Sequence, residues 1–258
     1  MSTRLLREIY WKFEKAIVPE LTSSQYHYQK KLFANLPNYK FSWLDLGCGH
    51  QVFADWMTAE EQAILAKARL AVGVDLDLPA LKAHKGLTDK IYADLTAIPL
   101  RDETFDVITA NMVVEHLDQP EKVFSEVCRL LRGGGVFVFH TTNAANPFIR
   151  AAAKFPQNLK NSLVYFLERR KGEDVFPTHY KVNRPQEVRA IAEQTGFQVE
   201  DIELVSTSAV TQVLTPVMPF ELLFIRLLRR PGLQHLRTNL ICVLRKKGDL
   251  DAARTDVA

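Results

Sequence analysis

The sequence has few cysteines, no long apolar run and little net charge, and each shortage excludes a class of protein. Its three cysteines, Cys48, Cys128 and Cys242, are widely spaced and odd in number, so we expect a reducing compartment and no disulfide framework. The sequence has no uninterrupted run of about 18 apolar residues, so no transmembrane span is predicted. The charged N-terminus lacks the pattern of a signal peptide. A formal net charge of +3 argues against a dedicated nucleic-acid binder. We therefore expect a cytoplasmic protein that does not bind nucleic acid.

Predicted strands and helices alternate through the first half of the chain. The strands are expected at about 41–46, 70–75, 90–93, 105–110 and 135–140, and the helices between them at about 52–68, 78–84 and 120–131. This alternation predicts an α/β fold with a Rossmann-like, doubly wound, mostly parallel sheet. Ligands of such sheets bind beyond the carboxyl ends of the strands.

A two-glycine turn follows the first predicted strand. The stretch from Trp43 to His50 ends its strand at Asp45 and then turns at Gly47 and Gly49. Glycine lets the backbone approach a ligand closely because no Cβ intervenes. The free N–H groups of a helix beginning near Gln51 would favour an anionic group on that ligand. The turn therefore suggests a nucleotide-like cofactor that carries a carboxylate or phosphate.

A second predicted strand also ends in an acid, Asp75. Dinucleotide-binding folds place an acid there to hold the ribose hydroxyls. The nicotinamide fingerprint needs a third glycine, and this chain has Val52 in that position. The residues thus argue against a nicotinamide oxidoreductase, which we keep as an alternative.

Further motifs follow in a fixed order. They are Tyr92–Leu95, Ile98–Leu100, Glu103–Ile108, Val113–Pro120 and Leu130–Phe139. Together with the glycine turn and Asp75, this order over about residues 40 to 143 resembles the class I S-adenosylmethionine-dependent methyltransferases, in particular the type 11 small-molecule enzymes. The family usually has proline where this chain has Gly133. The resemblance implies an antiparallel last strand, at about 238–244 in this sequence.

The resemblance also implies S-adenosyl-L-methionine as the cofactor and a role for each part of the site. The glycine turn would approach the methionine part of the cofactor, and the acid at the end of the second strand would bind the ribose. The residues after the third strand would border the adenine, and those after the fourth strand would border the methyl donor as well. The cofactor-binding residues expected on this basis are Asp45, Gly47, Cys48, Gly49, Asp75, Leu76, Asp94, Leu95, Asn111 and Met112. The alternative is that these acids cap helices or stay solvated.

Three histidines are candidates for a general base, because histidine titrates near neutral pH. We predict His116 and His179 as the catalytic residues, with His140 also considered. His116 could instead pack its own turn, and His179 could belong to a loop that caps the helix after Pro185. Met112 stands where metal-dependent relatives have a glutamate, so no metal is predicted.

The flanking regions carry less information. We expect N-terminal helices over 1–36, a methyltransferase domain over 37–247 with a helical cap insertion at about 144–183, and a flexible tail over 248–258. In residues 216–233, an apolar helix face is expected opposite a basic one. The apolar residues are Phe220, Leu223, Phe224, Leu227 and Leu228, and the basic ones are Arg226, Arg229 and Arg230. Packing on the protein's own sheet or on a second subunit is favoured over contact with an anionic membrane.

The function expected is methyl transfer to a small-molecule acceptor, on oxygen or carbon. The acceptor is expected to be a quinone-like, lipid-linked, sugar or secondary-metabolite molecule. A protein or RNA acceptor would need an open, charged groove, whereas the apolar insertion after residue 144 predicts a covered pocket. The protein is expected to be a monomer or homodimer. The alternative from another class is a non-catalytic cofactor-binding module of the same fold.

Overall fold

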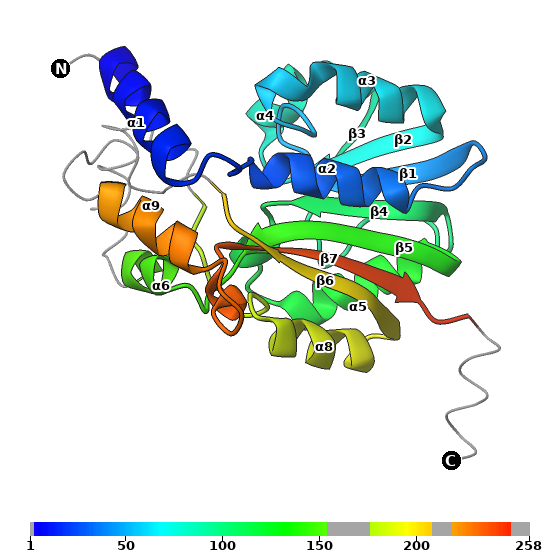
Figure 1. Ribbon diagram of the computed structural model, residues 1–258. Helices are drawn as coiled ribbons and strands as arrows, with labels where there is room; N and C mark the ends of the chain where they lie inside the picture. Colours follow the sequence, from blue (N-terminus) through cyan, green and yellow to red (C-terminus); the bar gives the residue numbers. More distant parts are fainter. Residues whose placement is uncertain (1–2, 154–175, 208–217, 249–258) are drawn as a thin grey trace.

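The computed structural model describes residues 3–153, 176–207 and 218–248 of the chain (Figure 1). The middle of the expected cap insertion and nearly all of the expected tail therefore lie outside the described residues. The strands are β1 Phe41–Leu46, β2 Ala68–Asp75, β3 Asp89–Tyr92, β4 Phe105–Asn111, β5 Leu131–Thr142, β6 Phe197–Val205 and β7 Asn239–Lys246. The α-helices are α1 Thr3–Ile17, α2 Ser24–Ala34, α3 Thr58–Lys67, α4 Leu78–Ala83, α5 Pro120–Leu130, α6 Pro147–Ala153, α8 Pro185–Gln194 and α9 Met218–Leu227. Short 3₁₀ helices are η1 Asp55–Met57, η2 Val114–His116 and η4 Gln234–Leu236.

The strands form one sheet in the order β3-β2-β1-β4-β5-β7-β6. Neighbours from β3 to β5 are parallel, and β7 runs antiparallel to both β5 and β6. This confirms the Rossmann-like α/β fold and the antiparallel last strand. The strand order reverses between β1 and β4, and ligands of open α/β sheets bind at such a switch point, beyond the carboxyl ends of the strands.

Helices cover both faces of the sheet (Figure 1). On one face α2, α3 and α4 bury apolar side chains such as Leu32, Ile64 and Leu81. On the other face α5 and α8 bury Phe124 and Ile191 among others. The two cores explain why β1 is buried at every position: a strand covered on both faces has no solvent side.

The helix that follows β1 begins later than expected. Residues 51–54 are irregular, η1 follows, and α3 starts only at Thr58, so the prediction of a helix from about residue 51 or 52 was wrong. The physical reason is that Val52 and Phe53 point into the core, where the Phe53 ring lies edge-on to Tyr28 of α2 with ring centroids 6.1 Å apart. The chain must pass that contact before a helix can form.

Helix α9 also differs from the expectation. Its buried residues are Met218, Glu221, Leu222 and Ile225, and the three apolar ones pack with Tyr10 and Val18 at the α1 end of the molecule. The predicted apolar face is instead largely exposed, and of its members only Leu228 is buried. The sequence could not show which face is buried, because apolar residues of this helix occur on more than one of its sides.

Helices α1, α6 and α9 gather at one end of the molecule, beyond the carboxyl ends of the parallel strands (Figure 1). Buried amides fix this arrangement: Asn143 Nδ2 donates to His235 O over 2.9 Å and to Arg237 O over 2.6 Å, and Asn146 Nδ2 donates to Leu236 O over 2.7 Å. None of the helices that the structure describes is long and apolar enough to cross a membrane.

Candidate functional site

The turn after β1 is bonded to the end of β2. Gly47 N donates to Val74 O over 2.8 Å, and Cys48 N donates to the same oxygen over 3.2 Å. Gly47 and Gly49 have φ angles of +60° and +53°, a region that favours glycine. A Cβ on Gly47 would lie 2.5 Å from Val113 Cγ2, whereas one on Gly49 would meet nothing within 4 Å. Gly47 therefore packs against the segment after β4, and Gly49 faces open space.

The carboxylate of Asp75 joins this turn to the segment after β2. Its Oδ2 accepts a hydrogen bond from Gly49 N over 2.7 Å, and its Oδ1 accepts one from Asp77 N over 2.8 Å. Leu76, which lies between Asp75 and Asp77 in the sequence, is exposed. Each carboxylate oxygen has a second lone pair, so Asp75 can still accept hydrogen bonds from a ligand.

Asp45 is buried at the same edge of the sheet. Trp43 Nε1 donates to Thr109 Oγ1 over 2.8 Å, and Thr109 Oγ1 donates to Asp45 Oδ1 over 2.5 Å. Burial raises the pKa of Asp45 to about 8; the Thr109 hydrogen bond opposes this rise, and the charges of Glu61 and Asp75 add to it. Asp45 therefore lies close enough to Glu61 and Asp75 for their negative charges to disfavour its ionised form.

Glu61 of α3 also contacts the segment that follows the glycine turn, and it was not among the residues predicted from the sequence. Burial raises its pKa, while hydrogen bonds from the backbone N–H groups of Val52 and Phe53 lower it. These N–H groups, like those of Gly47 to Gly49, are bonded within the protein. The expected row of free N–H groups for an anionic ligand group is thus wrong at these positions. The carboxyl groups of Asp45, Glu61 and Asp75 instead suit a ligand with positive charge.

Asp94 and Leu95 follow β3. Thr96 donates to Asp94 Oδ1 from both its N and its Oγ1, each over 2.8 Å, and these bonds lower the pKa of Asp94. Ala93 N donates to Asp75 O over 3.3 Å, which keeps this segment beside the end of β2. Asp94 itself is exposed and Leu95 is half-buried.

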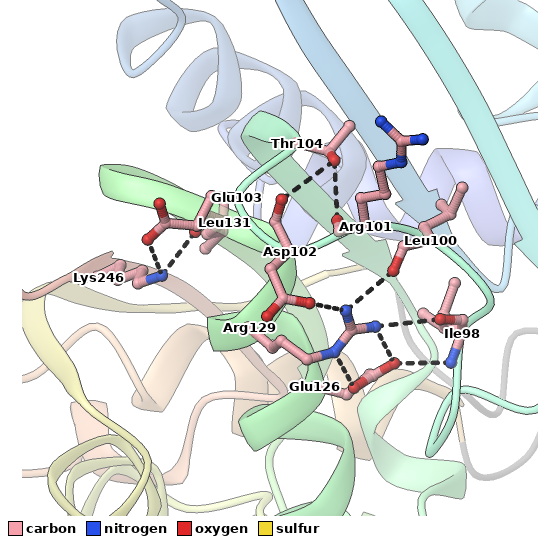
Figure 2. Close-up of polar contacts among 10 residues, drawn as sticks. All are labelled: Ile98, Leu100, Arg101, Asp102, Glu103, Thr104, Glu126, Arg129, Leu131 and Lys246. Carbon is pink, nitrogen blue, oxygen red and sulfur yellow. Dashed lines mark hydrogen bonds and ion pairs between the residues drawn. The ribbon is translucent and has the colours of Figure 1, made fainter.

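Arg129 and Glu126 of α5 hold the next part of this segment (Figure 2). Arg129 donates from Nη1 to Leu100 O over 2.9 Å and from Nη2 to Ile98 O over 3.1 Å. Glu126 accepts two bonds from Arg129 and one from Ile98 N over 2.7 Å. Asp102 also pairs with Arg129. The side chains of Arg129 and Glu126 thus form hydrogen bonds with the backbone between Asp94 and β4, as the backbone of a neighbouring strand does in a sheet, and they hold this segment in place.

Asn111 ends β4 and faces α2. Its Nδ2 donates to Gln25 Oε1 over 2.9 Å and to Val52 O over 3.3 Å, and His140 Nδ1 lies 2.9 Å from its Oδ1. Because Val52 O can only accept, the amide oxygen faces His140, whose Nδ1 is then the donor. Met112 follows with a φ of +59°, and strained backbone of this kind is concentrated at functional sites.

His140 does not suit the role of a general base. It is 1% exposed, and burial lowers its pKa to about 3. Its ring stacks on Tyr28 with centroids 5.7 Å apart. A base must accept a proton near the operating pH, so this residue stays neutral instead.

The two predicted catalytic histidines share one loop arrangement. His116 Nδ1 lies 2.9 Å from Pro177 O, and a carbonyl oxygen only accepts, so Nε2 is the free acceptor of the neutral ring. His179 N donates to Glu115 O over 2.8 Å, and His179 Nδ1 lies 3.7 Å from Asp118 Oδ1. Both side chains are partly exposed. In the described parts of the chain, no hydrogen bond joins either side chain to the glycine turn.

Glu115 lies beneath this loop with its carboxyl group fully buried. Thr141 Oγ1 donates to Glu115 Oε2 over 2.7 Å, and Asn183 Nδ2 donates to Thr141 Oγ1 over 2.7 Å. Burial raises the pKa of Glu115. Within the described residues, no group of three His, Cys, Asp or Glu side chains could hold a metal ion.

Comparison with known proteins identifies relatives. Residues 21–202 match a family model described as a methyltransferase domain. The chain is 29% identical over 161 residues to a Mycolicibacterium smegmatis protein named "Probable S-adenosylmethionine-dependent methyltransferase", covering 61% of this chain and 52% of that protein. It is 36% identical over 109 residues to the mitochondrial ubiquinone biosynthesis O-methyltransferase of Candida albicans, covering 39% and 32%. It is 33% identical over 106 residues to the malonyl-[acyl-carrier protein] O-methyltransferase of Methylococcus capsulatus, covering 40% and 38%.

The chain thus matches about half or less of the length of these curated relatives. Solved structures match over more of their length. An S-adenosylmethionine-dependent methyltransferase from Mesorhizobium loti has a TM-score of 0.55 at 19% identity, covering 84% of this chain and 96% of that one. One from Methanosarcina mazei has a TM-score of 0.56 at 12% identity, covering 85% and 98%. At these identities the likeness shows the shared fold.

Proposed function

Because the chain belongs to the methyltransferase domain family, we propose that it transfers the methyl group of S-adenosyl-L-methionine to a small-molecule acceptor. The family and the fold imply this cofactor. One observation carries the proposal: the glycine turn after β1 is bonded through Gly49 to Asp75 at the end of β2. This joins the two backbone elements that a nucleoside-containing ligand contacts in doubly wound folds.

The residues of the turn fit this cofactor. When bound, S-adenosyl-L-methionine supplies a methyl group on a positively charged sulfur. The carboxyl group of Asp45 lies close enough to Glu61 and Asp75 to interact with their charges, and a nearby positive charge would favour the ionised form of Asp45. Asp75 would accept hydrogen bonds from the ribose hydroxyls, and Asp94 with Leu95 would border the adenine.

The protein's own contribution is to hold and orient the reactants. Methyl transfer is an in-line displacement, so alignment and exclusion of water supply much of the rate. Asn111 and Met112 at the end of β4 would border the donor, with α2 above them through Gln25. Cys48, buried in the turn, would contribute only backbone, because burial raises the pKa of its thiol.

His116 and His179 are the residues that we propose for moving a proton. An acceptor hydroxyl must lose its proton, and the free Nε2 of His116 is available for this step when the ring is neutral. His179, beside Asp118, is the second candidate. An amine or stabilised carbanion would need this step less.

The acceptor is proposed to be a quinone-like, lipid-linked, sugar or secondary-metabolite molecule that is methylated on oxygen or carbon. The names of the Candida albicans and Methylococcus capsulatus relatives, both O-methyltransferases, favour oxygen. A cytoplasmic location, action without nucleic acid and a monomeric or homodimeric state belong to the same proposal. The proposal also includes the division of the chain into N-terminal helices, a methyltransferase domain with its cap, and a tail. It further includes peripheral membrane contact through residues 216–233.

Turnover tests this proposal directly. The purified protein is incubated with S-adenosyl-L-methionine and a panel of hydroxylated quinones, aromatic compounds and lipid-linked sugars, and release of S-adenosyl-L-homocysteine is measured. We expect release that depends on one class of acceptor and is reduced in His116→Ala or His179→Ala. Cofactor binding without turnover on any acceptor would favour the non-catalytic module.

A further inference from the structure

Helix α9 is held from its inner side. Met218, Leu222 and Ile225 pack in the small core that α9 shares with α1. Phe224, on one flank, lies edge-on to Phe148 of α6 with ring centroids 5.3 Å apart. The hydrogen bonds of Asn143 and Asn146 to residues 235–237 anchor the segment that follows. The orientation of α9 is therefore fixed, and so is the face that it turns outward.

That outward face is apolar. Phe220 is 69% exposed, Leu223 52% and Leu227 37%, and their spacing places them along one side of the helix, opposite the buried residues. A surface helix normally turns polar residues to the solvent. Three large apolar side chains in a row on the solvent side form a small exposed apolar patch, and apolar patches rimmed by polar residues can mark contacts with a protein or a membrane.

Basic residues flank this stripe. Arg226 is exposed on the helix, and Arg229 and Arg230 follow its end. Arg229 pairs with Glu20, while Arg226 donates only a long bond to Ile17 O over 3.4 Å. In the described part of the chain, neither Arg226 nor Arg230 forms an ion pair. An apolar stripe beside uncompensated positive charge is the pattern of helices that lie in the surface of an anionic membrane.

We propose that the outer stripe of α9, Phe220, Leu223 and Leu227, together with Arg226 and Arg230, docks this protein on an anionic phospholipid surface. The apolar side chains enter the boundary of headgroups and acyl chains, and the two arginines contact lipid phosphates. Because α9 lies at the end of the molecule beyond the carboxyl ends of the strands (Figure 1), docking turns the candidate site toward the membrane. An acceptor held in the bilayer would then be within reach.

A second copy of the chain is the competing occupant, and the geometry disfavours it. A helix of ten residues is about 15 Å long and about 10 Å wide, so its footprint is about 150 Å². A stable protein interface buries about 800 Å² on each partner. A symmetric contact through this face would also bring Arg226 and Arg230 near their own copies, and like charges repel.

Sedimentation with lipid vesicles tests the docking surface without any methyl acceptor. The full chain is mixed with vesicles of phosphatidylcholine alone or of phosphatidylcholine with phosphatidylglycerol. The variants are Phe220→Ser and Arg230→Gln. Their matched controls are Tyr39→Ser, a 60% exposed aromatic residue just before β1 at the opposite end of the strands, and Arg189→Gln, an exposed arginine of α8.

We expect the unmodified protein to sediment with the anionic vesicles and to be released by salt. Phe220→Ser should weaken this partition about tenfold, and Arg230→Gln about fivefold, while both controls bind like the unmodified protein. Calorimetry with S-adenosyl-L-homocysteine should give equal affinities for all five proteins, which separates docking from the proposed activity.

Several results would overturn the docking surface. One is absence of binding to the anionic vesicles, and another is binding by Phe220→Ser that equals that of the unmodified protein. A dimer that Phe220→Ser converts to monomer, seen by light scattering, would assign the stripe to a second copy instead.

Discussion

Replacing Asp75 by alanine should damage both the fold and the proposed cofactor site, by separable amounts. The carboxylate accepts two short bonds, from Gly49 N and Asp77 N. A hydrogen bond to a charged group contributes about 1.5–3 kcal/mol. Water can replace part of this interaction because Asp75 lies at the edge of the buried region. We therefore expect the free energy of unfolding to fall by about 2–4 kcal/mol.

The affinity for the cofactor should fall independently of that loss. The ribose hydroxyls lose their acceptor in Asp75→Ala, which costs about 1–3 kcal/mol, or roughly 5- to 150-fold in dissociation constant. Calorimetric titration with S-adenosyl-L-homocysteine, at a temperature where the variant is fully folded by circular dichroism, measures this change.

Asp77→Ala is the matched control. Asp77 Oδ1 accepts a bond from Ala80 N over 2.9 Å at the start of α4, and removal of such a cap costs about 1 kcal/mol of stability. The backbone N–H of Asp77 that binds Asp75 remains. The affinity of Asp77→Ala for S-adenosyl-L-homocysteine should therefore match that of the unmodified protein. An unchanged affinity in Asp75→Ala would refute the proposed role of Asp75 in binding the ribose.

Three further predictions concern other residues of the site. Burial raises the pKa of Asp45 to about 8, so the folded protein keeps a proton that the unfolded chain releases above about pH 4. Through this group, stability should then fall between about pH 4 and 8, by at most about 1.4 kcal/mol per pH unit, and Asp45→Asn should take that contribution out of the slope measured by chemical denaturation. Arg129→Gln should weaken binding of S-adenosyl-L-homocysteine about tenfold by freeing the adenine segment, whereas Arg245→Gln, which only loses bonds to Glu200 and a backbone oxygen, should not. With a hydroxyl acceptor, His116→Ala should lower kcat by about 10²-fold or more and leave the KM for the cofactor unchanged; an equal kcat would exclude it as the base.

The alternation of strands and helices and the position of the glycine turn could be predicted because their signals are local. The acids Asp45 and Asp75 end two buried strands, and Gly47 and Gly49 mark the turn between strand and helix. Alternation of short elements then predicts the parallel sheet, and the family resemblance supplies the antiparallel last strand.

The start of α3 and the partners of the turn could not be predicted, because they depend on distant residues. Phe53 packs on Tyr28, which lies on α2 and not in the turn. The carboxylate of Glu61, one turn inside α3, takes the N–H groups that sequence reasoning reserved for a ligand. Such contacts appear only when the chain is folded.

The orientation of α9 could not be predicted either. Its apolar residues occur on more than one side, so periodicity cannot choose which side packs. The choice is made by Tyr10 and Val18 from the other end of the chain, which take Met218, Leu222 and Ile225 and leave Phe220 outside.

The measurement that tests the central claim most directly is calorimetric titration of the purified protein with S-adenosyl-L-methionine, S-adenosyl-L-homocysteine and NADH. The account predicts that both adenosyl compounds bind at one site per chain, that Asp75→Ala weakens both, and that NADH does not bind. Failure of both adenosyl compounds to bind, or tighter binding of NADH, would contradict it.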